Sequence, residues 1–229
     1  MSFDIKTIAV LTIGGIEIWI TETMTGTWII MALLIALAVA VRVRLNKFNE
    51  VPTGFQNAIE AIVEAFCNFV RESAGEKLMF LGNWYFMVFS FILLSNLSGL
   101  LFLRPPTADW TLTFAFAFVT FLLIQAMGIK FRKGGYIKSL FEPYPAFFPL
   151  NVIGEISRPI SLSFRLFGNI LAGTILMGLL YEMAPVLLRF LVPLPLHAFF
   201  DVFAGVLQTY VFSVLSLSFI SAAASAEGE

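Results

Sequence analysis

Long apolar runs, separated by short polar or proline-rich segments, dominate the sequence. About 20 apolar residues cross the hydrocarbon core of a bilayer as one α-helix. Five of the runs reach that length, so the pattern predicts an all-α, polytopic membrane protein with about five transmembrane helices. The predicted spans, within a single membrane domain over residues 1–229, are 27–45, 78–103, 110–129, 149–183 and 196–224.

Residues 51–72 follow a different pattern. Their apolar side chains recur with a period of about 3.6 residues on one face, and their polar side chains lie elsewhere. This pattern predicts an amphipathic helix that lies in the membrane interface instead of crossing the bilayer. Its apolar face consists of Phe55, Ile59, Ile62, Val63, Phe66 and Val70.

The fourth apolar run is longer than a perpendicular span needs. About 35 residues would extend over about 52 Å as an unbroken helix. We therefore expect the last two spans to be long and tilted, with a bend at Pro159 in the fourth.

Composition supports a membrane protein: 59% of the residues are hydrophobic and 13% are charged. Soluble domains contain about 25% charged residues, so a soluble enzyme is excluded. The single cysteine, Cys67, excludes an intrachain disulfide and a cysteine-based metal site. The segment from Met1 to Lys6 has no basic region of a signal peptide, so we expect the first span to be retained.

Basic residues fall mainly after the first and third spans. The opposite side has only Lys6, Arg104 and Arg189. Because Lys and Arg accumulate in cytoplasmic loops, we expect the N-terminus outside and the C-terminus in the cytoplasm. The residues on the basic side are Arg42, Arg44, Lys47, Arg71, Lys77, Lys130, Arg132, Lys133 and Lys138.

Arg165 lies in the middle of the fourth span, within "SLSFRLFGN" (residues 161–169). An arginine stays protonated, and at the centre of a lone membrane helix it costs about 2.5–3.5 kcal/mol. No acid lies three or four residues away, and Glu155 is better placed to pair with Arg158. We therefore expect a transient counter-charge from another chain; the alternative is a structural arginine satisfied by Gln208 or by snorkelling.

Small residues follow this arginine at Gly168, Ala172 and Gly173. Such a surface lets another helix approach closely. Packing within the chain itself is an equally good interpretation.

The last span carries a second set of polar residues. His197, Asp201 and Gln208 are spaced by four and seven residues, which places them on one helix face. A buried carboxylate beside an imidazole is typical of a proton relay. The alternatives are an interfacial His197 without a role and a structural Asp201.

The segments "RPISLSFRLFGNILAG" (158–173) and "DVFAGVLQTYVF" (201–212) closely resemble subunit a of the F-type ATP synthase. The resemblance continues through "TGTWIIM" and "VPTGFQNAIEAIVE" and covers essentially the whole chain. It implies a stator subunit of the inner (plasma) membrane, with b-type peripheral stalk subunits, a ring of c subunits and membrane lipid as partners. It also implies a translocated proton, or alternatively sodium, without cofactor, nucleic acid or catalysis by this chain.

The resemblance also assigns roles to single residues. Arg165 matches the arginine that faces the carboxylate of the rotating c ring, and Asn169 and Gln208 match its polar companions. Asp201 matches an acid or histidine position of the outer half-channel, which His197 would also line.

Two positions depart from the pattern of many members. Thr174 stands where they have a glutamate, so we expect it to be at most a hydrogen-bonding companion of Asp201. Asn151 stands where some have a glutamate in the inner half-channel. Glu155, on the same face, is then the candidate substitute, with Ser218 nearby on the inner path.

Two other classes of function remain as alternatives. In a secondary transporter, Arg165 would bind an anionic substrate, but the sequence has no internal repeat. A purely structural scaffold would leave the buried polar residues unexplained. The sequence has no GxxxxGK[ST] motif, so we expect ATP chemistry on other subunits.

Overall fold

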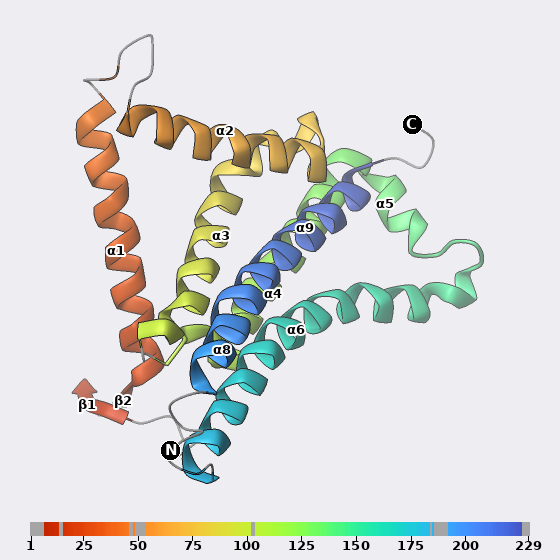
Figure 1. Ribbon diagram of the computed structural model, residues 1–229. Coiled ribbons are helices and arrows are strands. Elements are labelled where there is room, and N and C mark those ends of the chain that lie inside the picture. The colour runs from red at the N-terminus through yellow and green to blue at the C-terminus, as the bar shows by residue number, and fades with distance from the viewer. Residues whose placement is uncertain are drawn as a thin grey trace. The chain divides into compact units, whose positions relative to one another are not determined.

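The computed structural model describes residues 7–13, 16–45, 48, 54–101, 104–183, 185 and 192–225. Helices make up most of this part of the chain (Figure 1). The α-helices are α1 (Glu22–Arg44), α2 (Phe55–Ala74), α3 (Gly82–Leu97), α4 (Trp110–Arg132), α5 (Gly134–Ser139), α6 (Phe148–Met183), α8 (Pro193–His197) and α9 (Gly205–Ala224). Short 3₁₀ segments are η2 (Glu76–Leu81), η3 (Ser98–Leu101), η4 (Pro106–Ala108) and η5 (Pro145–Phe147), and η6 (Ala198–Ala204) is a π-helix.

Five of the described helical segments are long and apolar enough to cross a membrane. This confirms the prediction of an all-α, polytopic membrane protein. The segments are Glu22–Arg44, Glu76–Leu101, Trp110–Arg132, Pro145–Met183 and Pro193–Ala224. Pro159 lies inside α6, which has 36 residues and continues on both sides of the proline.

A β-hairpin precedes α1, and the sequence analysis missed it. Strands β1 (Thr7–Ile13) and β2 (Ile16–Thr21) pair in antiparallel register, with Val10 opposite Trp19. The signal was present in the sequence, because a Gly-Gly pair separates two runs rich in isoleucine, valine and threonine. Each run is far shorter than a membrane-spanning helix.

The chain forms two compact units. The first comprises Met1–Ala40, Phe89–Thr113 and Phe164–Tyr210, and the second comprises Val41–Val88, Phe114–Ser163 and Val211–Glu229. The helices α1, α3, α4, α6 and α9 contribute residues to both units. Arg165 therefore belongs to the first unit, and Glu155 belongs to the second.

The second unit has a continuous hydrophobic core. Side chains of α2, η2, α3, α4, α5 and α9 form it, and Tyr85, Leu217 and Ile220 are almost completely buried in it. The ring of Phe66 on α2 packs edge to face with the ring of Phe86 on α3, with 5.1 Å between the ring centroids. These contacts attach the end of α2 to the first turns of α3.

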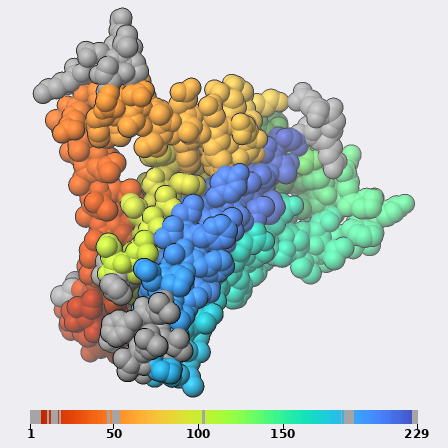
Figure 2. All heavy atoms as spheres, viewed as in Figure 1, coloured from red at the N-terminus to blue at the C-terminus, as the bar shows by residue number. Residues whose placement is uncertain are grey.

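The apolar face of α2 is divided along its length. Val70 is fully buried in the core, whereas Phe55, Ile62 and Val63 remain exposed. The space-filling view shows the side chains of α2 at the surface (Figure 2). An exposed apolar stretch on a helix of this amphipathic pattern favours the predicted interfacial position.

Candidate functional site

Arg165 lies on an open face of α6 in the first unit. Its side chain is exposed, as are Gly168 and Ala172, one and two turns further along. A Cβ added at Gly168 would meet no atom within 4 Å. In the described part of the chain, Arg165 forms neither an ion pair nor a hydrogen bond, and none joins it to Gln208. An unpaired guanidinium thus stands on an outward surface where a second helix has room.

The small residues near Arg165 divide between two roles. Gly173 is buried, and a Cβ there would lie 3.1 Å from the Cβ of Phe200. Gly173 therefore serves packing within the chain, between α6 and η6. Gly168 faces outward, so it retains the interpretation that another helix approaches there.

His197 and Asp201 form the second polar element of the first unit. His197 Nδ1 lies 2.5 Å from Asp201 Oδ2, and both side chains are about four-fifths buried. Tyr181 Oη lies 3.4 Å from the other ring nitrogen, Nε2. The predicted shared face of His197 and Asp201 is confirmed by this contact. The imidazole has a polar group at each nitrogen, so it is oriented to pass a proton from one side to the other.

Gly99 makes room for the carboxylate. A Cβ at Gly99 would lie 3.0 Å from both Cγ and Oδ2 of Asp201. Asp201 itself lies within the π-helix η6, and π-helical turns are frequent at functional sites. The sequence analysis assumed one regular α-helix here and did not predict the π-helical turn.

Gln208 follows on α9 and is buried, at 7% exposure. Its Nε2 is buried without a hydrogen-bond partner among the described residues. A buried amide donor without a partner costs about 1–3 kcal/mol. Such a group needs an explanation, and a bound water or a neighbouring polar chain would supply the missing acceptor.

Asn96 anchors α9 to α3, and the sequence analysis missed it. Its Nδ2 donates to the carbonyl oxygen of Gly205 at 2.9 Å and to Thr209 Oγ1 at 3.2 Å. Its Oδ1 accepts a hydrogen bond of 2.8 Å from Thr107 Oγ1. The Asn96 amide, the Gly205 carbonyl and the hydroxyls of Thr209 and Thr107 are therefore all buried and hydrogen-bonded. A buried amide within a predicted span was the available signal.

Thr174 and Asn169 contribute less to these contacts. Thr174 Oγ1 donates to the carbonyl oxygen of Ile170 at 2.9 Å, so its hydroxyl is bonded within its own helix. Asn169 is half-buried and makes no hydrogen bond in the described structure. Neither side chain contacts Asp201 through a described hydrogen bond.

A second polar cluster surrounds Glu155 in the second unit. Arg158 Nη1 lies 2.8 Å from Glu155 Oε1, which confirms the ion pair expected from their spacing. Gln125 Nε2 donates to Glu155 Oε2 at 3.4 Å, and Tyr136 Oη donates to Gln125 Oε1 at 3.0 Å. Three helices, α4, α5 and α6, therefore meet at this carboxylate.

The cluster opens into a cavity of about 340 Å³. Asn151 lines the cavity with Glu155, but its Nδ2 donates to the carbonyl oxygens of Leu140 and Glu142, at 2.9 and 3.0 Å. Its amide thus holds the loop before α6. Ser218 is not among the residues that line the cavity; it lies one turn before Ala222, which is.

Tyr136 is a proton donor in this cluster at neutral pH. Burial raises the pKa of its phenol, and the negative charge of Glu155 raises it further. The hydrogen bond to Gln125 and the charges of Arg158 and Arg132 oppose this shift in pKa. Because the net shift is upward from 10, the hydroxyl keeps its proton and can donate to Gln125.

Ionisable groups inside spanning helices are typical of membrane proteins that move ions, and this chain has that arrangement in both units. The family model for the ATP synthase A chain matches residues 24–221. The chain belongs to the ATP synthase subunit a family.

Individual relatives agree over almost the whole length. "ATP synthase subunit a" from Moorella thermoacetica is 36% identical over 223 residues, covering 95% of this chain and 96% of the relative. "ATP synthase subunit a, sodium ion specific" from Propionigenium modestum is 35% identical over 88% of this chain and 73% of its own. "ATP synthase subunit a 3" from Pelobacter propionicus is 37% identical over 87% and 86% of the two chains.

Proposed function

We propose that this chain is the stator subunit of the membrane sector of an F-type ATP synthase. It provides two ion half-channels and couples ion flow to rotation of a ring of c subunits and to ATP synthesis on other subunits. The observation that carries the proposal is the exposed Arg165, which has no partner in the described chain. The family to which the chain belongs supplies the kind of partner for Arg165, a ring carboxylate.

Arg165 would act through its permanent charge. Opposite a ring carboxylate, a guanidinium favours the ionised form of that acid and drives its proton toward the inner side. It also repels a proton that would pass directly between the half-channels, and it does not release a proton itself. Asn169 and Gln208 flank this contact, and the buried amide of Gln208, which has no partner among the described residues, is available to a bound water.

The outer half-channel would use His197 and Asp201. A proton arriving at the imidazole passes from Nδ1 to the carboxylate of Asp201, which lies in direct contact with it. Tyr181 at the other ring nitrogen returns or accepts a hydrogen bond as the tautomer changes. Thr174 has no described contact with this pair, so it serves at most a neighbouring water.

The inner half-channel would use the cavity at Glu155. Its carboxylate lines the cavity and is oriented by Arg158 and Gln125. Asn151 shapes the same cavity by holding the preceding loop, and Ser218 lies one turn away along α9.

The transported ion is proposed to be a proton. An imidazole in contact with a carboxylate transfers protons, whereas hard metal cations prefer a cage of oxygen ligands. The relative from Propionigenium modestum is named as sodium ion specific, which makes sodium the alternative to test. The N-terminus would lie outside and the C-terminus in the cytoplasm of the plasma membrane, with b-type subunits as stalk partners.

The test replaces Arg165 in the complete complex. In reconstituted vesicles, Arg165→Ala should abolish ATP synthesis driven by an imposed proton gradient, and Arg71→Ala, at an exposed position of α2, should retain it. Substituting a sodium gradient distinguishes the two ions. Full coupling in the Arg165→Ala complex would contradict the proposal.

A further inference from the structure

Two arginines, Arg132 and Arg158, line the cavity of the second unit, and among the described residues only Arg158 has an ion-pair partner. Arg158 contacts Glu155 and also lies over the ring of Phe219, 5.4 Å from its centroid. Arg132, the last residue of α4, is half-buried. In the described ranges it forms no ion pair and no hydrogen bond. The cavity lining therefore has one more cation than anion.

The guanidinium groups of both arginines line the same cavity, near the hydroxyl of Tyr136. Both Arg132 and Arg158 act on the Tyr136 hydroxyl, where they oppose the effect of Glu155 on its pKa. The cavity wall thus combines a positive charge with free N–H donors, since a guanidinium carries five. Other polar atoms in the lining are already used: Ser139 donates to the carbonyl oxygen of Tyr136, and Asn151 donates to its loop.

The location of the cavity indicates where its ligand comes from. Arg132 ends α4, and Ala222 and Ala223 belong to the last turn of α9, so the cavity lies where two spanning helices end. This is the level of lipid headgroups in a bilayer. Leu140 and Leu150 add apolar surface to the same lining.

We propose that this cavity binds the phosphate group of an anionic phospholipid. Arg132 is the principal contact, because a guanidinium matches two phosphate oxygens with parallel N–H groups. The apolar lining faces the glycerol and the first acyl carbons. Basic pockets between membrane helices bind acidic headgroups in this way. The inference adds a ligand to the cavity that the proposed function gives to the inner half-channel, and the labelling test below does not depend on ion flow.

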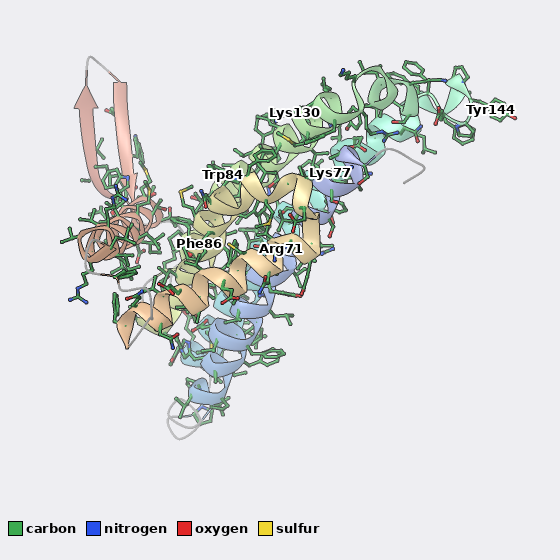
Figure 3. All side chains as sticks on the ribbon, turned by 90° about the horizontal axis from the view of Figure 1, so that it is seen from above. Arg71, Lys77, Trp84, Phe86, Lys130 and Tyr144 are labelled. Carbon is green, nitrogen blue, oxygen red and sulfur yellow. The ribbon has the colours of Figure 1, made fainter. Side chains whose placement is uncertain are left out.

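The neighbouring lysines, Lys130 and Lys138, lie in a different environment from Arg132. Lys130 on α4, labelled in Figure 3, places its ammonium 4.8 Å from the centroid of the Phe80 ring of η2. Lys138 is exposed on α5 and does not line the cavity. Lys138 is therefore the matched control, because it is a cation six residues after Arg132 that does not line the cavity.

The experiment uses the complete complex in vesicles that contain a photoactivatable phosphatidylglycerol, with photoactivatable phosphatidylcholine as the zwitterionic probe. We expect phosphatidylglycerol to label peptides of the cavity lining. Arg132→Gln should lower this labelling about fivefold, since one basic residue near the surface contributes about 1 kcal/mol to anionic lipid binding. Lys138→Gln should leave it unchanged, and Arg132→Lys, which keeps the charge without the fork, should give an intermediate decrease.

Each other outcome overturns the proposal. Equal labelling by both lipids, or equal loss in Arg132→Gln and Lys138→Gln, would show diffuse attraction without a site. Displacement of the label by inorganic phosphate at millimolar concentration would assign the cavity to a free anion. If Arg132→Gln complexes fail to assemble, the Arg132→Lys complex still tests the proposal. Unchanged labelling in that complex would show that the guanidinium is not needed to bind the lipid phosphate.

Discussion

Adding one methyl group at Gly99 should disturb the proposed outer half-channel without changing any ionisable residue. Gly99 lies in η3, and its new Cβ would stand 3.0 Å from Cγ and Oδ2 of Asp201 and 3.1 Å from Oδ1. Carbon atoms in ordinary contact are about 3.5–4.0 Å apart. The carboxylate or the backbone must therefore move by roughly 0.5 Å or more to relieve the clash.

The movement would act on the proposed proton path because Asp201 is in direct contact with His197. Misplacing a reacting group by about 1 Å lowers a rate by about 100-fold, so about half that displacement predicts a decrease of roughly tenfold. Overpacking of a filled site also costs about 1–3 kcal/mol of stability. We expect Gly99→Ala complexes to assemble and to conduct protons about tenfold more slowly.

The assay is proton flux through the membrane sector in vesicles, with the catalytic sector removed and a potential imposed by potassium and valinomycin. Gly82→Ala is the matched control, since a Cβ at Gly82 meets nothing within 4 Å. Equal proton flux in Gly99→Ala and Gly82→Ala would refute the reasoning, because it would show that the position of the Asp201 carboxylate does not affect the rate of flux.

Three further results are expected. Asp201→Asn keeps the volume of the side chain but removes the titratable group, so proton flux should fall sharply while subunit assembly, followed by native gels, stays intact; unchanged flux would take Asp201 out of the path. Asn96→Leu removes the amide that donates to the Gly205 carbonyl and accepts from the buried Thr107 hydroxyl, and we expect the complex to lose about 1–3 kcal/mol of stability in thermal unfolding, a cost that Asn96→Asp, which lacks the amide donor, should also show. The raised pKa of Tyr136 means that its protonated form stabilises the fold fully below pH 10 and that this contribution is lost as pH rises through the folded pKa. The difference in tyrosinate absorbance near 295 nm between the native and the Tyr136→Phe complexes, which isolates Tyr136, should therefore rise only above pH 10. A Tyr136 signal that titrates at 10 or below would contradict its burial.

The residues that could be predicted from the sequence are those whose role depends on the free-energy cost of a charge in the bilayer or on the spacing of residues along one helix. A charge at Arg165 is expensive in a bilayer wherever the helices pack, so its need for a counter-charge or for solvation followed from the apolar run alone. The Glu155–Arg158 pair followed from a spacing of three residues on one helix. The five spans followed from length and hydropathy.

Contacts between helices depended on the tertiary structure. Asn96 looked like one polar residue in a span, and only the packing of α3 against α9 gave it Gly205 and Thr209 as partners. Gln125 and Tyr136 reach Glu155 from two other helices, which no helical period links. The sequence by itself determined which groups must be solvated or paired, because burial in lipid sets that cost locally; the fold decided their partners, because distance in space is independent of distance along the chain.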